Sequence, residues 1–253
     1  MNKILLLAWV TVREALRQKL AVNLLLFALL LIAGSITLSE LTFGEQHRII
    51  ADLALTSAQL FGTLIAVFLG AGLVAGDVQR RTLYPIVAKP VGRWQYLVGR
   101  YLGLLATLWL NLLVMALASV VVLAIYSGGF SYLEKTPLVA AFLGVGAQLA
   151  MVAAVATLFS SVTNSTLAAI YTLGFAVSGH FARDVFVFYK ENALVRAVAF
   201  VIPNLGALDF KVQVVYQTAV PLERLAWPLA AGAVYVACVL SIAAAGFARR
   251  DFR

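Results

Sequence analysis

Five long stretches of the sequence contain no Asp, Glu, Lys or Arg, and they constrain the fold more than any other feature. They cover residues 20–39, 53–76, 101–126, 136–182 and 225–248. A helix needs about 20 predominantly apolar residues to cross the hydrocarbon core of a membrane. Only 12% of the residues are charged, against about 25% in a typical soluble domain. The sequence therefore predicts an all-α, polytopic membrane protein that forms one domain over residues 1–253.

The stretch 136–182 is too long for a single spanning helix. Its 47 residues would form a helix of about 70 Å, more than twice the thickness of the hydrocarbon core. The polar cluster at 160–166 predicts a turn that divides it into two helices, and Pro137 suits the first turn of the earlier one. Six transmembrane helices result, so both termini are expected on the same side.

The charged residues between these helices indicate the orientation. With the N-terminus inside, 12 of the 19 basic residues but only three of the 11 acidic ones, Glu14, Asp77 and Asp251, fall on the inner side. This asymmetry follows the positive-inside rule. We expect a multi-pass protein of the bacterial inner membrane with both termini in the cytoplasm. No basic patch is left over to indicate nucleic-acid binding.

Residues 1–19 have the pattern of an amphipathic helix. No small-residue cleavage site follows the apolar start, which argues against a signal peptide. At 100° per residue, one face is apolar and the opposite face is polar. The apolar face comprises Leu5, Trp9, Val12 and Leu16, and the polar face comprises Thr11, Glu14, Arg17 and Gln18. We expect a helix lying in the membrane interface; the alternative is a cytoplasmic extension of the first span.

The longest outer segment, 183–224, is not uniformly polar. An apolar stretch at 193–202 is followed by Pro203-Asn204-Leu205-Gly206, a sequence typical of a turn. This pattern favours short extracytoplasmic helices, re-entrant or interfacial, before the last span. The alternative is a periplasmic helix that packs on the outer ends of the spanning helices.

The sequence lacks the motifs that indicate several kinds of chemistry. There is no phosphate-binding loop for ATP, and the isolated His47, His180 and Cys238 do not form a metal-ligand pattern. No charged residue lies well inside a predicted span, whereas ion-coupled carriers commonly place one there. We therefore expect a non-catalytic membrane subunit without a cofactor or metal of its own.

A few uncharged polar residues do lie within the predicted spans: Gln59, Asn111, Gln148 and Asn164. Such side chains commonly form hydrogen bonds between helices, and the alternative is that some line a translocation path. Two glycine pairs, Gly72 with Gly76 and Gly99 with Gly103, have the spacing that permits close helix contact.

The segment 77–100 differs from the rest because it is basic and contains Pro85 and Pro90. These prolines limit helices to short pieces, near 78–84 and from Arg93 onward. A short, rigid cytoplasmic helix of this kind suits docking to a soluble partner. The alternative is an ordinary positive loop that only sets the topology.

The residues of this segment match a known pattern. The sequences DVQRRTLYPIVAKPVGR (77–93) and YLVGRYLG (96–103) closely resemble the first cytoplasmic loop of ABC-type permeases of the type-2 exporter family. LFSSVT at 158–163, IPNL at 202–205 and FARRDF at 247–252 also resemble motifs of that family, in the same order. Within the family, the loop is most similar to the branch of gliding-motility and nitrous-oxide-reductase copper-maturation permeases.

The resemblance implies an N-terminal elbow helix, six spans and a coupling helix near 78–84. It also implies two permease copies, identical or different, that work with two separate ABC ATPase subunits carrying ATP and Mg²⁺. Asp77, Arg80, Arg81 and Arg93 are then the expected contacts with the ATPase. The same coupling segment includes Thr82, Leu83 and Tyr84. Arg93 has an alternative role as an anchor for lipid phosphate.

Two functions remain open at this point. The leading one is the permease of an ATP-driven exporter. The alternative is a membrane scaffold that relays the motion of the ATPase to a periplasmic or membrane partner without passing cargo. The sequence does not identify the cargo, because one fold hosts many functions.

Overall fold

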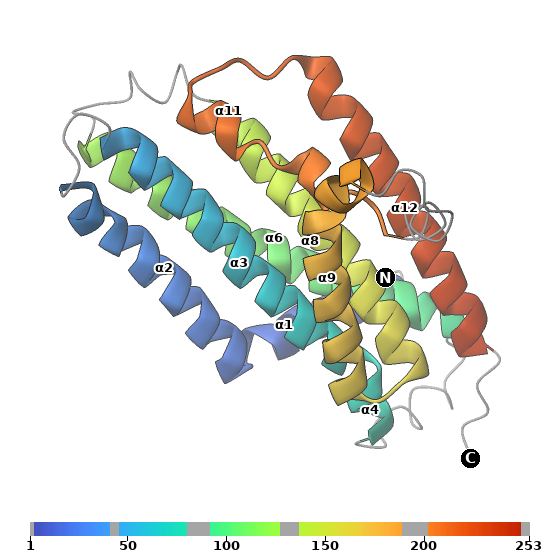
Figure 1. Ribbon diagram of the computed structural model, residues 1–253. Helices are drawn as coiled ribbons and strands as arrows, with labels where there is room; N and C mark the ends of the chain where they lie inside the picture. Colours follow the sequence, from blue (N-terminus) through green and yellow to red (C-terminus); the bar gives the residue numbers. More distant parts are fainter. Residues whose placement is uncertain (1–2, 41–45, 80–91, 127–136, 189–201, 249–253) are drawn as a thin grey trace.

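The computed structural model describes residues 3–40, 46–79, 92–126, 137–188 and 202–248 (Figure 1). Every regular element within these ranges is helical, which confirms the all-α prediction. Six of the helices have 22 or more residues: α2 (Lys19–Glu40), α3 (Gln46–Leu73), α6 (Arg93–Tyr126), α8 (Leu138–Val162), α9 (Ser165–Phe188) and α12 (Leu222–Ala248).

Five helical segments of the described residues are long and apolar enough to cross a membrane. They are Lys19–Glu40, Gln46–Gln79, Arg93–Tyr126, Leu138–Val162 and Leu222–Phe247. Helix α9, at the place of the fifth predicted span, has 24 residues but is not among them. Its second half contains His180, Arg183 and Asp184, which lower its mean hydropathy. The structure thus provides candidates for five of the six predicted spans.

Helices α3 and α8 form the centre of the bundle, with α2 packed on α3 and α12 packed on α8. Gly70 on α3 permits this close approach, because a Cβ atom there would lie 2.5 Å from the Cβ of Ala156 on α8. Small residues at such crossings are typical of helices packed in membranes. The predicted contact through Gly72 and Gly76 is different: a Cβ atom at either position would meet nothing within 4 Å.

The turn between α8 and α9 lies where the polar cluster predicted it. Helix α8 ends at Val162 and α9 begins at Ser165. The backbone N–H of Leu167 donates to the side-chain oxygen of Asn164 at 2.9 Å. Asn164 is therefore the N-cap of α9, and this bond lies within its own turn rather than between helices.

The region before the last span packs into the bundle. The 3₁₀ helix η1 (Leu205–Leu208) and helix α11 (Lys211–Val215) are the short helices of this region. They contact α3, α8 and α9, and Leu205, Leu208 and Val214 are almost fully buried. Close contact is required at Gly144 on α8, where a Cβ atom would lie 2.3 Å from the carbonyl oxygen of Leu208. Residues 189–201 lie outside the described part of the chain.

Helix α1 (Lys3–Leu16) occupies the position of the predicted N-terminal helix and packs mainly against α6. Its predicted apolar face points away from the protein, since Leu5 and Trp9 are more than 60% exposed. The face that carries Thr11 packs against the glycine pair Gly99 and Gly103 of α6. A Cβ atom at Gly103 would lie 2.5 Å from the Cβ of Thr11.

Candidate functional site

The basic segment 77–100 begins at a break in a long helix. Helix α3 ends at Leu73, one turn residue follows, and α4 (Ala75–Gln79) begins immediately after it. Helix α4 therefore forms a short extension at the end of α3 (Figure 1). A break of this kind leaves backbone groups without their usual helical partners.

Ser160 on α8 supplies partners for those groups. Its hydroxyl oxygen accepts hydrogen bonds from the backbone N–H groups of Val74 and Ala75, both at 3.0 Å. The same hydroxyl donates to the carbonyl oxygen of Ala71 at 2.8 Å. Ser160 is completely buried. Three hydrogen bonds from one side chain thus fix the point at which the basic segment leaves the bundle.

Asp77 on α4 points into the protein. Its residue is only 7% exposed, and its Oδ2 accepts hydrogen bonds from the hydroxyl of Tyr96 and from the guanidinium of Arg100. Both partners lie in the first turns of α6. The first and last residues of the segment 77–100 are therefore joined directly by an ion pair.

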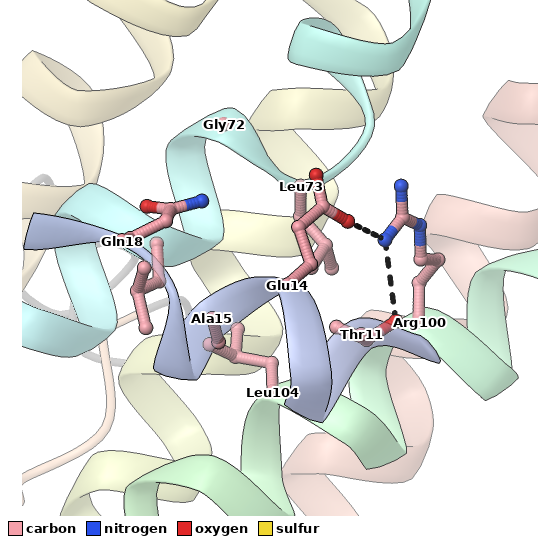
Figure 2. A pocket seen from close by; sticks show the side chains of 9 residues that line it. Thr11, Glu14, Ala15, Gln18, Gly72, Leu73, Arg100 and Leu104 are labelled. Carbon is pink, nitrogen blue, oxygen red and sulfur yellow. Dashed lines mark hydrogen bonds and ion pairs between the residues drawn. The ribbon is translucent and has the colours of Figure 1, made fainter. Parts of the chain in front are cut away.

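Arg100 also binds the N-terminal helix. Its Nη1 lies 2.7 Å from Glu14 Oε2 and 3.3 Å from Thr11 Oγ1, both on α1 (Figure 2). Its Nε donates to the hydroxyl of Tyr96 at 3.4 Å. We call Thr11, Glu14, Asp77, Tyr96 and Arg100 the ionic cluster. It connects α1, α4 and α6 through one guanidinium group.

Burial makes the ionic cluster sensitive to the loss of a partner. The side chains of Arg100 and Asp77 are 8% and 10% exposed, whereas that of Glu14 is 41% exposed. A charge buried away from water is tolerated only when it is paired and hydrogen-bonded. Removing Arg100 leaves the buried charge of Asp77 uncompensated, whereas removing Asp77 leaves Arg100 with Glu14 as its remaining acidic partner. The contribution of Glu14 is smaller because water screens it.

Apolar packing encloses the ionic cluster on the side of the last helix. Val74 at the helix break, Tyr96, Leu97, Ala243 and Phe247 form a separate small core. The rings of Tyr96 and Phe247 are stacked with their centroids 5.9 Å apart. On the other side, a cavity of about 30 Å³ lies between α1, α3 and α6, with Glu14, Gln18 and Arg100 in its wall (Figure 2). A polar cavity of this size accommodates a water molecule.

Two of the predicted docking residues lie within the described part of the chain. Asp77 belongs to the ionic cluster, and Arg93 is the first residue of α6, as the prolines of the segment predicted. Arg80, Arg81, Thr82, Leu83 and Tyr84 lie outside the described residues, together with most of the predicted coupling helix 78–84. The role of these residues in binding an ATPase stays a prediction.

Sequence reasoning missed four residues of this site: Glu14, Tyr96, Arg100 and Ser160. A signal for one of them, Glu14, was present. Glu14 and Asp77 are two of only three acidic residues on the predicted inner side, and both bind the same arginine. Acidic residues that depart from the positive-inside pattern are therefore good candidates for internal ion pairs.

A second polar cluster lies within the bundle. Gln59 Nε2 on α3 donates to Gln148 Oε1 on α8 at 2.9 Å, and it lies 2.7 Å from His180 Nε2 on α9. Gln148 Nε2 donates to the carbonyl oxygen of Leu205 at 2.8 Å. Gln59 and Gln148 thus form the hydrogen bonds between helices that are usual for such residues. Asn111 instead donates to Thr107 within its own helix.

No group of three or more His, Cys, Asp or Glu residues in the described ranges is arranged to hold a metal ion. The ionic cluster joins three helices through buried side chains.

Comparison with known protein families gave a match. A family model described as "ABC-2 family transporter protein" matches residues 5–220. The match begins in α1 and continues beyond α11, so it includes the ionic cluster, the helix break and the second polar cluster. No curated protein matches the chain.

Proposed function

The chain belongs to the ABC-2 family of transporter proteins, and from this we propose that it is the permease through which a separate ATPase drives movement across the bacterial inner membrane. Membership of the family makes the chain a membrane subunit of an ABC transporter, and its long apolar helices agree with a multi-pass protein. The proposal adds three things: that the movement is export, that it is coupled to the ATPase through the basic segment, and that two permease copies assemble with two ATPase subunits.

The observation that supports the coupling route is the ion pair between Asp77 and Arg100. The segment proposed to contact the ATPase starts and ends at this pair, so a force on the segment acts on both α4 and α6. Arg100 passes the displacement to α1 through Glu14 and Thr11. Contiguous hydrogen bonds and rigid helices are the physical means by which distant parts of a protein are coupled.

The helix break gives this movement a defined pivot. Ser160 holds the backbone at Val74 and Ala75 against α8, and α8 is part of the core of the bundle. Helix α4 can then tilt about this point, and the tilt is passed to α3, which continues through the break into α4. We propose that ATP binding closes the two ATPase subunits and moves the coupling segments of the two permeases about these pivots.

The ATPase contact is testable with charge reversal at Arg80 and Arg81. Arg80→Glu with Arg81→Glu is expected to abolish co-purification of the partner ATPase. Lys211→Glu with Arg224→Glu, which changes the charge equally near α11 and the start of α12, is the matched control and should retain the ATPase. If the ATPase still co-purifies with the first variant at the control level, the docking role is wrong.

A second function, mechanical relay, is favoured by one specific contact. Gln148 on the central helix α8 donates to the carbonyl oxygen of Leu205 in η1, so the region before the last span is bound directly to the core. Movement of the bundle would then reach this region and a partner bound to it.

Flux measurements distinguish the two functions. Vesicles that contain the permease with its ATPase are supplied with ATP and with candidate lipid, glycan and peptide cargoes. ATP-dependent flux of any of them supports transport. An ATPase that remains coupled to the permease while no cargo moves supports relay.

A further inference from the structure

Helix α1 presents an exposed row of side chains that changes character along the helix. Leu5, Trp9, Arg13 and Arg17 are spaced by four residues, which places them along one side of a helix. All four are exposed, and Leu5 and Trp9 are more than 60% exposed. The row therefore begins with two apolar side chains and ends with two guanidinium groups, in the last turn of α1 and just beyond it.

A third cation follows at this end of the row. Lys19 is the first residue of α2, two residues after Arg17, and it is exposed. Leu16 and Leu20, on either side of the turn between α1 and α2, are 48% and 44% exposed. We call Arg13, Arg17 and Lys19 the basic corner. Its cations lie next to apolar side chains that the rest of the described chain does not cover.

The surrounding helices offer the basic corner no acidic partner. The acidic residues of α1, α2, α3, α4 and α6 are Glu14, Glu40, Asp52 and Asp77. Glu14 and Asp77 both bind Arg100. Glu40 is the last residue of α2, whereas Lys19 is the first. Asp52 lies near the start of α3, and it is the last turns of α3 that approach the end of α1. Within the described part of the chain, the three positive charges of the basic corner therefore have no counter-charge.

The fold divides the polar face that the sequence predicts for α1. Thr11 and Glu14 point toward Arg100 (Figure 2), whereas Arg17 remains exposed, as Leu16 does. The ionic cluster thus engages the one acidic residue of α1, so the charges that α1 presents along its exposed row are all positive.

The chemistry of this surface selects a phosphate group that is attached to apolar chains. Guanidinium groups bind phosphate oxygens through paired N–H donors, and Arg13 and Arg17 are separated by about 6 Å along the helix axis. The long side chains of Arg and Lys reach headgroups while their stems pack on apolar surface. A zwitterionic lipid would bring its own ammonium group next to three cations, which repel it. An anionic phospholipid with a glycerol headgroup carries no ammonium group.

We propose that the basic corner binds the headgroup of an anionic phospholipid in the membrane leaflet that α1 faces. The phosphate lies between Arg13 and Arg17, Lys19 attracts it from the start of α2, and the acyl chains lie against Trp9 and Leu16. Basic residues on an amphipathic helix are attracted to acidic lipids in this way. The proposal specifies the charge of the lipid, which an interfacial position of α1 alone does not, and it is independent of the cargo and of the direction of transport.

Native mass spectrometry of the full-length protein in detergent measures its affinity for individual lipids. The probes are phosphatidylglycerol and phosphatidylcholine with identical acyl chains. The original protein is expected to bind the first phosphatidylglycerol molecule roughly tenfold more tightly than phosphatidylcholine, or better, because three basic residues contribute. In Arg13→Gln with Arg17→Gln, this preference should fall about fivefold or more, since two of the three charges are lost.

Two control variants separate the role of these residues from folding and from net charge. Arg13→Lys with Arg17→Lys keeps both charges and should keep most of the preference. Lys211→Gln with Arg224→Gln removes two positive charges near α11 and the start of α12, and it should keep all of it. An unchanged preference in Arg13→Gln with Arg17→Gln would overturn the proposal. An equal loss in the Lys211 and Arg224 variant would overturn it too, because net charge alone would then explain the preference.

Two further measurements identify other occupants of the basic corner. Inorganic phosphate in large excess is not expected to displace phosphatidylglycerol, because it has no acyl chains to pack on the apolar side chains. Displacement would show a site for a free anion and would overturn the proposal. Addition of the partner ATPase should leave the preference for phosphatidylglycerol intact. Loss of the preference would show that the ATPase, and not lipid, covers the basic corner, which would also overturn the proposal.

Discussion

Arg100 donates a hydrogen bond to Asp77, although the whole basic segment separates the two residues in the sequence, and both side chains are buried. One residue starts the basic segment and the other ends it. Their ion pair holds the two ends of the segment together at the surface of the bundle. Helix α4 and the start of α6 are therefore fixed to each other where the segment begins and ends.

The first prediction concerns the strength of this pair. Arg100→Gln is expected to lower the free energy of unfolding by about 3–5 kcal/mol, because it leaves the buried charge of Asp77 without its partner. Asp77→Asn should lower it by less, because Arg100 keeps its ion pair with Glu14. The double variant should lose less stability than the sum of the losses in the two single variants, as expected for side chains that interact directly. Chemical unfolding in detergent micelles measures all three.

Glu14→Gln is the control within the same ionic cluster. Its side chain is 41% exposed, so water screens its interaction with Arg100 and the change should be small. Additive losses for Asp77→Asn and Arg100→Gln would show that the two side chains do not interact.

The second prediction concerns the helix break. Ser160→Ala removes the hydroxyl that accepts from Val74 and Ala75 and leaves two buried N–H groups without partners. Each such group costs about 1–3 kcal/mol, so thermal unfolding should occur at a clearly lower temperature. Thr157→Val is the matched control on the same helix, since its buried hydroxyl bonds only to Ala153 in that helix. Equal losses of stability in the two variants would show that Ser160 does not hold the helix break in place.

The third prediction concerns the docking of α1 on α6. Gly103→Ala places a Cβ atom 2.5 Å from Thr11 Cβ and 2.6 Å from the carbonyl oxygen of Ala8, so α1 must move away. Gly72→Ala adds the same atom where nothing lies within 4 Å. Limited proteolysis should cleave α1 faster in the first variant and at the original rate in the second. A protected α1 in Gly103→Ala would contradict this contact.

The fourth prediction concerns the link from α8 to the region before the last span. Gln148→Leu removes the donor to the Leu205 carbonyl and the acceptor for Gln59. Hydrogen exchange over residues 205–215 should become faster, because this region loses its side-chain anchor to the core. Asn111→Leu, at a buried amide that bonds within its own helix, should leave exchange there unchanged. Equal exchange in both variants would show that packing alone holds the region.

Much of the architecture could be predicted because it depends on local composition. The turn at Thr163 and Asn164 followed from the only polar cluster in a long apolar stretch, and the start of α6 at Arg93 followed from Pro85 and Pro90. The limits of α3 could not be predicted in the same way. It begins at Gln46, ahead of the uncharged stretch. A helix can extend beyond the hydrocarbon core, because its charged residues are then in contact with water.

The site could be predicted only in part because its bonds join distant segments. Asp77 was identified from the charged segment that it begins, but its burial against Tyr96 and Arg100 depends on how α4 and α6 pack. Glu14 was assigned to a polar face that was expected to meet water or lipid headgroups. That face packs on α6 because Gly99 and Gly103 leave room for it. The spacing of the two glycines indicated that another helix approaches closely, but it did not indicate which helix.

The most direct test of the coupling route is the response of α11 to ATP in the complex with the ATPase. Helix α3 contacts α11 and continues through the break into α4, so movement at α4 should change hydrogen exchange at Lys211–Val215. The original protein is expected to show an ATP-dependent change there, and Arg100→Gln is expected to bind the ATPase normally without that change. An undiminished response in Arg100→Gln, with the ATPase bound, would contradict the proposal that force enters the bundle through the Asp77–Arg100 pair.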